Sequence, residues 1–143
     1  MDQMAFHHRA DSGLSDELEA LASTVIGVCI EVHSILRPGL PESVYRNAIS
    51  RELTLRGIPH ECEAPVPVYY KGELVGQGRV DVLVDGQLVV ELKVVDALND
   101  IHRAQCLAYL CALQLELALL INFNVVVLKD AIKRVIRSEA KFG

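Results

Sequence analysis

The chain has 143 residues, of which 51% are apolar and 23% are charged, and its formal net charge is -5 at pH 7. This length suits one domain, residues 1–143, around one hydrophobic core, and the composition excludes an acidic disordered chain. The negative charge weakens any assignment as a stand-alone nucleic-acid binder, because such proteins generally present a basic surface. It does not exclude one, because carboxylates gathered to hold a metal also make the charge negative.

The sequence gives little indication of a membrane span, a signal peptide or paired cysteines. No apolar run reaches the length of about 18 residues that a membrane span needs, so we expect no membrane segment. Residues 1–13 lack the apolar block of a signal peptide, which predicts a cytoplasmic protein with a loose N-terminal arm. The four cysteines include no CxxC pair and are predicted to be free thiols rather than zinc ligands.

Two helices are predicted in the first part of the chain. An apolar stripe at helical spacing begins after Ser15, a suitable N-cap, and ends before residues 37–39. A second helix starts at Pro41 and runs to about Arg56, followed by Gly57, which suits a left-handed position after a helix. The stripe of the first helix is expected to pack on the core, and a dimer interface is its alternative use.

The hydrophobic period then changes to that of β-strands. Residues 61–70 are predicted to form a strand, and its two prolines favour a place at a sheet edge. Residues 74–84 and 87–95 are two further strands separated by Asp85-Gly86, a strong hairpin signal.

The last part of the chain completes the predicted fold. A third helix is expected from about residue 99 to residue 114, followed by strands at 116–122 and 124–128. The tail over residues 131–143 is expected to be partly helical. The order ααβββαββ predicts an α/β sandwich, with a mixed sheet flanked by helices.

The segment with the most chemical information contains Asp81 and the triplet Glu91-Leu92-Lys93. On a strand, Glu91 and Lys93 point to the same face, which is otherwise apolar. Burying their charges in that face costs desolvation free energy on the order of several kcal/mol. Structural or surface ion pairing is one explanation. A divalent ion held by Asp81 and Glu91 is the other, and Mg²⁺ suits such a site because it needs only one or two carboxylates. In that case Lys93 would hold the attacking water or the phosphate charge.

The two carboxylates can share a face only if the hairpin between them is irregular. A two-residue turn at Asp85-Gly86 would place Asp81 and Glu91 on opposite faces, because side chains alternate along a strand. We therefore predict a three-residue loop at residues 84–86, or a bulge.

Two pairs of residues outside the strands support this interpretation. Gln105 and Tyr109 are four residues apart and share one helical face, although they would also fit an ordinary polar helix edge. Glu42 and Tyr45 lie near the start of the second helix. Glu42 is a candidate third acid, and a first-turn residue that is stabilised by the helix dipole is the alternative.

Together these motifs resemble the small bacterial GxxExxY family, which is placed in the PD-(D/E)xK nuclease superfamily. The likeness spans residues 18–136. It is carried by the joint order of residues 39–45 (GLPESVY), Asp81, residues 91–93 (ELK), residues 105–109 (QCLAY) and residues 120–123 (LINF).

The resemblance implies a restriction-endonuclease-like core with a divalent metal. In that superfamily Asp81, Glu91 and the backbone carbonyl of Leu92 would bind Mg²⁺, with Mn²⁺ as a substitute. Lys93 would assist the nucleophilic water, and Glu42 would complete the site.

Further roles follow from the same resemblance. Gln105 and Tyr109 match a QxxxY helix that positions the substrate or the site in other branches of the superfamily. His102, one turn before Gln105, is a candidate phosphate contact. Val80 departs from the pattern, because the proline that gives the superfamily its name would stand there, but that proline is not a ligand.

The leading hypothesis is a magnesium-dependent nuclease that hydrolyses phosphodiester bonds in DNA, with RNA less favoured. The alternative is a nucleic-acid-binding or assembly module with little or no turnover, which the acidic balance and small size favour. A third hypothesis is a site that cleaves only within a larger complex. A homodimer or a partner protein would supply the second DNA-binding element that superfamily nucleases often need.

Overall fold

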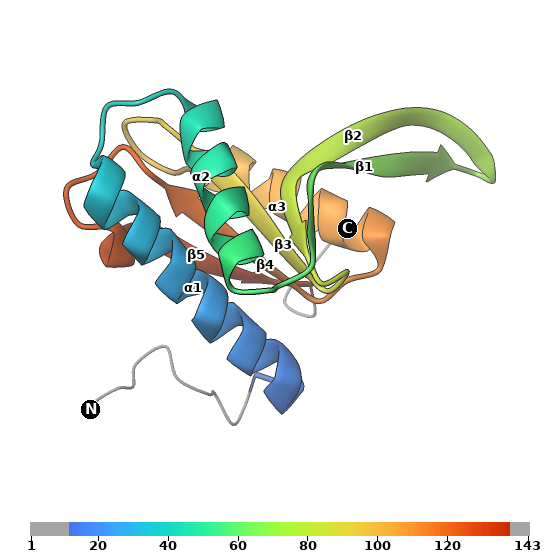
Figure 1. The fold of residues 1–143 in the computed structure, drawn as a ribbon. Coiled ribbons are helices and arrows are strands. Elements are labelled where there is room, and N and C mark those ends of the chain that lie inside the picture. The colour runs from blue at the N-terminus through green and yellow to red at the C-terminus, as the bar shows by residue number, and fades with distance from the viewer. Residues whose placement is uncertain (1–11, 138–143) are drawn as a thin grey trace.

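The computed structural model describes residues 12–137, in which three α-helices pack on the two faces of one five-stranded β-sheet (Figure 1). In chain order the elements are α1 (Asp16–Leu36), α2 (Glu42–Leu55), β1 (His60–Tyr70), β2 (Glu73–Val84), β3 (Leu88–Lys93), α3 (Asp100–Leu113), β4 (Leu117–Asn122), the 3-10 helix η1 (Leu128–Ala131) and β5 (Ile132–Ile136). The expected order ααβββαββ and the α/β class are confirmed. The loose arm expected over residues 1–13 lies, up to residue 11, outside the described residues.

The strands lie side by side in their chain order, β1-β2-β3-β4-β5. Neighbouring strands are antiparallel except β3 and β4, which are parallel because α3 carries the chain back across one face of the sheet. β1 is an edge strand, as its two prolines predicted. The β3-α3-β4 unit pairs Lys93, at the end of β3, with Asn122, at the end of β4.

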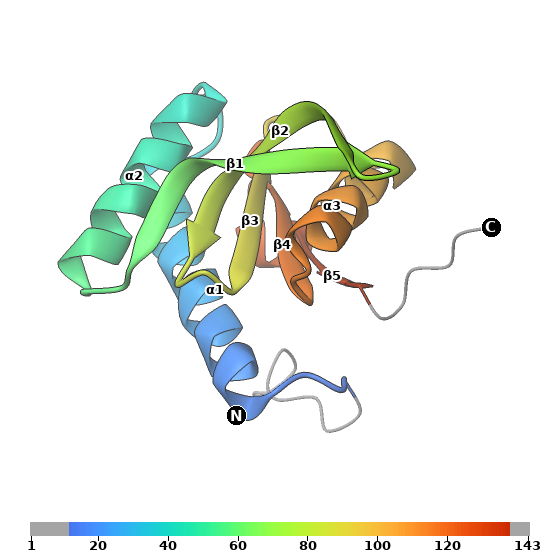
Figure 2. The same cartoon turned by 90° about the vertical axis from the view of Figure 1, so that its right-hand side faces the viewer.

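The helices cover the two faces of the sheet, with α1 and α2 on one face and α3 on the other (Figure 2). Along β3 the side chains alternate between these layers: Leu88, Val90 and Leu92 pack with α1 and α2, whereas Val89 packs with α3. This alternation confirms the predicted faces. It places Glu91 on the α3 side, where the residue is only 4% exposed.

α1 begins at its predicted N-cap, where Ser15 Oγ accepts a hydrogen bond from the Leu18 N–H. By length and composition alone α1 could span a membrane, but 50% of its most apolar window is buried inside the protein. Its apolar stripe packs against the sheet, which confirms the expected core role. An ion pair of 2.9 Å between Arg134 Nη2 and the buried Glu19 Oε2 ties α1 to β5.

α2 begins one residue later than predicted, because Pro41 is the N-cap rather than the first helical residue. Arg56 is the C-cap, and Gly57 follows with a left-handed φ of 71°, as expected. Glu42 is therefore the first residue of α2, where the helix dipole stabilises negative charge.

The predicted last strand, 124–128, is wrong. In this segment the Asn124 N–H donates to the Asn122 side chain, His33 Nε2 donates to Val125 O, and Val126 is 86% exposed. The fifth strand is β5, inside the tail that was expected to be partly helical, and the rest of that tail, from residue 138, lies outside the described residues.

Candidate active site

The hairpin between β2 and β3 has the irregular form that the site requires. Val84 pairs with Leu88, which leaves a loop of three residues, Asp85, Gly86 and Gln87. The predicted odd loop is therefore confirmed, but its position at 84–86 is wrong by one residue. Asp85 (φ 53°) and Gly86 (φ 66°) both adopt the left-handed conformation of a tight hairpin turn. Gln87, which follows the glycine, is therefore the extra residue of the loop.

β2 separates from β3 at Asp81. The two strands pair only from Val82 to Val84, and upstream of this stretch β2 stays with β1. Opposite Asp81, Glu63 has a left-handed φ of 50°, and the side chains of Val80 and Val82 lie in different core layers. The strand therefore bends at Asp81, and the adjacent edge of β3 is left open.

The two carboxylates at this opening accept backbone hydrogen bonds from the opposite strand. The Asp81 N–H donates to Glu91 Oε1 at 2.9 Å, and the Leu92 N–H donates to Asp81 Oδ2 at 2.7 Å. Because neither N–H is used in the β2-β3 ladder, the side chains replace the missing strand pairing. This reciprocal pair holds Asp81 and Glu91 next to each other at the base of the opening.

Glu42 adds a third acid from α2. Burial is the largest effect that raises its pKa, followed by the charge of Asp81 and a side-chain hydrogen bond with Asp81. The charges of Lys93 and Arg46 act in the opposite direction. Glu42 therefore lies against the Asp81 carboxylate, as the predicted site requires.

Glu91 is the most strongly perturbed acid of the site. Burial, and then the negative charge of Asp81, raise the pKa of Glu91 to about 8, although the Asp81 N–H and Lys93 both lower it. With no further cation beside it, Glu91 therefore carries a proton at neutral pH.

A polar chain connects β3 to α3. Lys93 Nζ donates to Gln105 Oε1 at 3.0 Å, and Gln105 Nε2 donates to the Tyr109 hydroxyl at 3.5 Å. The Tyr109 ring lies against Gly78 of β2, where an added Cβ would be 2.7 Å from Tyr109 Cε1. The structure thus brings Gln105 and Tyr109 to the candidate site and uses them to hold the Lys93 ammonium.

Comparison with family models decides the assignment of this constellation. The model described as the PD-(D/E)XK nuclease superfamily matches residues 19–135. The chain belongs to the PD-(D/E)XK nuclease superfamily. No curated protein and no solved structure matches the chain.

PD-(D/E)XK nucleases generally use divalent metals, and the residues present can be tested for their fit to one. Within residues 12–137 no group of three or more His, Cys, Asp or Glu side chains is arranged to hold an ion. The available donors are oxygens: the Asp81 and Glu91 carboxylates lie together, and the Glu42 carboxyl lies against Asp81. Such a set suits Mg²⁺, which binds through one or two carboxylates and completes its shell with water and phosphate. The raised pKa of Glu91 also fits, because a cation would take the place of its proton.

The remaining predicted residues have structural partners in this PD-(D/E)XK fold. His102 is half-buried at the start of α3, and its Nδ1 accepts a hydrogen bond from the Asn99 N–H in a capping box. Its contact with phosphate stays a prediction. All four cysteines are free thiols, as predicted, and burial raises the pKa of Cys106, which lies near the site, to about 12.

Asn122 is a residue of the site region to which the sequence assigned no role. The Val95 N–H donates to Asn122 Oδ1 at 3.2 Å, and Asn122 Nδ2 donates to Val95 O at 2.9 Å. The chain that leaves β3 just after Lys93 is thereby tied to the end of β4. Its place in the LINF segment, 120–123, was the available signal, but the motif alone does not reveal the bonding partner.

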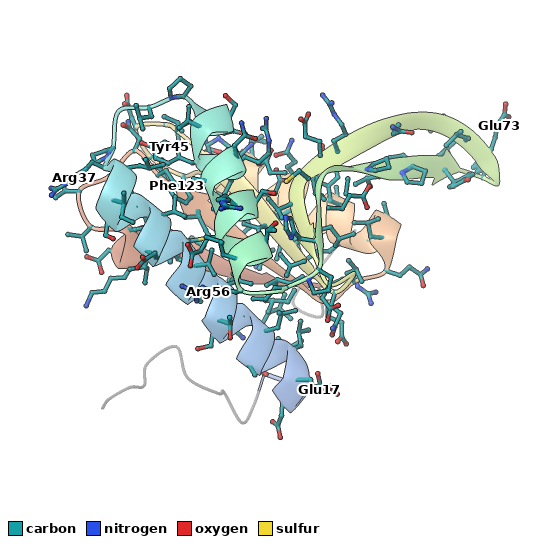
Figure 3. All side chains as sticks on the ribbon, viewed as in Figure 1. Glu17, Arg37, Tyr45, Arg56, Glu73 and Phe123 are labelled. Carbon is teal, nitrogen blue, oxygen red and sulfur yellow. The ribbon has the colours of Figure 1, made fainter. Side chains whose placement is uncertain are left out.

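Tyr45, which the sequence paired with Glu42, has contacts that the sequence did not reveal. Its hydroxyl donates to Arg37 O at 2.5 Å, and its ring stacks on Phe123 with 4.7 Å between ring centroids (Figure 3). The Phe123 N–H in turn donates to Lys93 O at 2.8 Å. Tyr45 therefore fixes the loop before α2, and with it Glu42, against the strand end that carries Lys93.

Proposed function

We propose that this protein is a metal-dependent nuclease of the GxxExxY family that hydrolyses phosphodiester bonds, with DNA as the expected substrate. The supporting observation is the convergence of Glu42, Asp81, Glu91 and Lys93 where β2 leaves β3. Carboxylates and a lysine at an open strand edge match the needs of phosphodiester hydrolysis, in which negative charge develops on phosphate oxygens.

Each residue of the proposed site has a defined task. Asp81, Glu91 and the Leu92 carbonyl would hold Mg²⁺ or Mn²⁺, which when bound lowers the pKa of a water and polarises a phosphate oxygen. Glu91 must first lose the proton that burial favours. Lys93, oriented by Gln105, donates to the attacked phosphate or to the attacking water. Glu42 accepts a proton or a water hydrogen bond beside Asp81.

A cleavage assay with matched variants tests this proposal. Single- and double-stranded DNA and RNA are incubated with the purified chain in Mg²⁺, in Mn²⁺ and in EDTA. We expect divalent-dependent cleavage that Lys93→Met lowers by about 10²- to 10³-fold, the usual effect of removing a donor to a developing oxyanion. Asp81→Asn should abolish cleavage.

Asp85→Asn is the control. Asp85 is an exposed acid of the same hairpin, and its side chain accepts a hydrogen bond from Gln87 Nε2. Asparagine keeps the backbone N–H that donates to Pro59 O and tolerates the left-handed φ of 53°. Cleavage that is equal in wild type and Asp81→Asn would rule out the proposed site.

A binding or assembly module is the second candidate function. The net charge of -5 favours it, since a stand-alone nuclease gains affinity from a basic surface. Binding of nucleic acid without cleavage in either metal supports this module. Cleavage that appears only with a partner protein supports the third hypothesis, a site that acts within a complex.

A further inference from the structure

Two arginines share one carboxylate beside the candidate active site. Glu63 of β1 lies opposite Asp81, and its Oε1 accepts a hydrogen bond of 2.9 Å from Arg79 Nη1. Its other oxygen, Oε2, is 3.5 Å from Arg46 Nη2. We call Arg46 and Arg79 the arginine pair.

The arginine pair lies on the same two elements as the acids of the site. α2, which packs beside β1 and β2, carries Glu42 and Arg46 four residues apart and hence on one face (Figure 2). Arg79 precedes Asp81 by two residues on β2. One face of α2 therefore meets β2 twice, through Glu42 at Asp81 and through Arg46 and Glu63 at Arg79.

The spacing along both elements is that of neighbouring phosphates. Four residues of a helix rise about 6 Å, and two residues of a strand span about 6.6 Å. Successive phosphates of one nucleic-acid strand rise by about 3.4 Å along a helix axis. The arginine pair is therefore about one or two nucleotides from a phosphate at Asp81.

The chemistry of the arginine pair suits a second anion as well as Glu63. A guanidinium offers five N–H donors in a planar fork that matches phosphate as well as carboxylate, and the contact with Glu63 takes one donor of each arginine. The Arg79 side chain is 65% exposed and that of Glu63 46%, so an incoming anion can reach them. Two positive charges face one carboxylate, which leaves a local excess of positive charge.

We propose that the arginine pair binds a phosphate diester of a nucleic-acid strand, about one or two nucleotides from the phosphate at the Asp81 site. In the free protein, Glu63 takes the place of this phosphate. The inference rests on the proposed nuclease function and assigns a substrate subsite to it. The net charge of -5 belongs to the whole chain, and at 0.1 M salt exposed charges farther away than about 10 Å are largely screened.

Fluorescence anisotropy in EDTA tests the subsite without a metal and without cleavage. The probe is a labelled single-stranded DNA of 12 nucleotides, measured between about 20 and 200 mM salt. Arg46→Met and Arg79→Met should each weaken binding by about 10- to 150-fold, the effect of losing a hydrogen bond between charged groups. Each should also lower the slope of log affinity against log salt by about 0.7, because one phosphate contact is lost.

Glu63→Gln separates the subsite from an ion network that only supports the fold. It removes the competing carboxylate and leaves both guanidiniums. The affinity should therefore rise by about two- to fivefold, the equivalent of one exposed ion pair, and the salt slope should become steeper by about 0.7. If Glu63 served only to hold the strands, its loss would weaken binding as the arginine substitutions do.

Two further variants complete the set. Arg79→Lys keeps the charge without the planar fork, so it should keep the salt slope but lose affinity. Arg51→Met is the control, because it removes the same charge from an exposed position of α2 that lies about 140° around the helix from Arg46. It should leave affinity and salt slope close to those of the wild type. Unchanged far-UV circular dichroism would confirm that the variants keep the fold.

Several results would overturn the inference. They are equal affinity and salt slope in the wild type and both methionine variants, weaker binding by Glu63→Gln, and no binding by either the wild type or Glu63→Gln. Displacement of the strand by millimolar inorganic phosphate at constant ionic strength would also overturn it, since it would indicate a site for a free anion.

The nuclease proposal is tested separately, because the binding assay requires no cleavage and Asp81→Asn should still bind the strand. A protein that binds as predicted but never cleaves would support the subsite and reject the nuclease. Cleavage by a protein whose variants all bind alike would support the nuclease and reject the subsite.

Discussion

Glu91 is a buried carboxyl group whose folded-state pKa of about 8 lies far above the ordinary glutamate value. Between the two values the folded protein keeps a proton that the unfolded chain has lost. The free energy of unfolding should therefore fall as the pH rises from about 4.5 to 8, by about a few kcal/mol at most. The shift thus destabilises the metal-free fold at alkaline pH.

This pH dependence can be measured by urea unfolding between pH 5 and pH 9 in EDTA. Glu91→Gln should flatten the profile, because glutamine keeps an acceptor for the Asp81 N–H and has no proton to lose. Glu42, whose pKa is also raised, leaves a residual slope in the same direction. Profiles of equal slope in the wild type and Glu91→Gln would contradict the assignment.

At the residue scale, the sequence correctly predicted the features that depend only on the alternation of side chains along a strand. The shared face of Glu91 and Lys93 follows from the two-residue period of a strand, and the need for an odd loop follows from parity. The hydrogen bonds that Asp81 forms with Glu91 and Leu92, in place of regular strand pairing, were not predictable from the sequence. They depend on the bend opposite Glu63, where a non-glycine residue adopts a left-handed φ of 50°.

The contact between β2 and α3 is the test at the scale of elements. Gly78→Ala places a Cβ 2.7 Å from Tyr109 Cε1, so the ring must move or the helix must shift. We expect a loss of about 1–3 kcal/mol in unfolding free energy and a displaced Tyr109 ring signal by nuclear magnetic resonance. Cleavage should fall too, because Tyr109 supports Gln105 and hence Lys93.

Gly76→Ala is the matched control on the same strand. An added Cβ at Gly76 meets nothing within 4 Å and its φ is not positive, so alanine should be neutral or slightly stabilising. If both variants had the same stability and the same Tyr109 signal, the proposed contact would be wrong.

The elements that the sequence misplaced are those whose partners are distant. Three consecutive valines, 125–127, have a strong strand composition, but side chains of α1 and β4 bond the backbone there and Val126 faces solvent. In β5 the charged residue Arg134 occupies a largely buried position. The alternation of apolar and polar residues that would predict a strand is therefore not visible in the sequence of β5. The partner of Arg134, Glu19, lies 115 residues away, so local periodicity carries no trace of the pair.

At the scale of the whole molecule, this ion pair joins the first helix to the last strand. Arg134 Nη2 and Glu19 Oε2 are 2.9 Å apart, with side-chain exposures of 12% and 4%, and Ser12 also donates to Glu19. Arg134→Met should lower the unfolding free energy by about 3–5 kcal/mol, because it leaves a carboxylate buried without its guanidinium. Urea unfolding measures the loss.

The double variant Glu19→Gln/Arg134→Met should recover part of this stability, since it removes the buried charge as well as its partner. If Arg134→Met alone cost no more than an exposed substitution, the pair would not fix α1 to the sheet.

The central claim is that Asp81 and Glu91 hold a divalent ion at the opening between β2 and β3. Calorimetric titration with Mn²⁺ tests it most directly, with Asp81→Asn as the variant and Asp85→Asn as the control. Asparagine keeps an acceptor for the Leu92 N–H, so the fold should be retained. We predict binding to the wild type that strengthens between pH 6.5 and 8.5 as Glu91 gives up its proton, and that weakens at least about tenfold in Asp81→Asn but not in Asp85→Asn. Equal Mn²⁺ affinity in the wild type and Asp81→Asn would contradict the account.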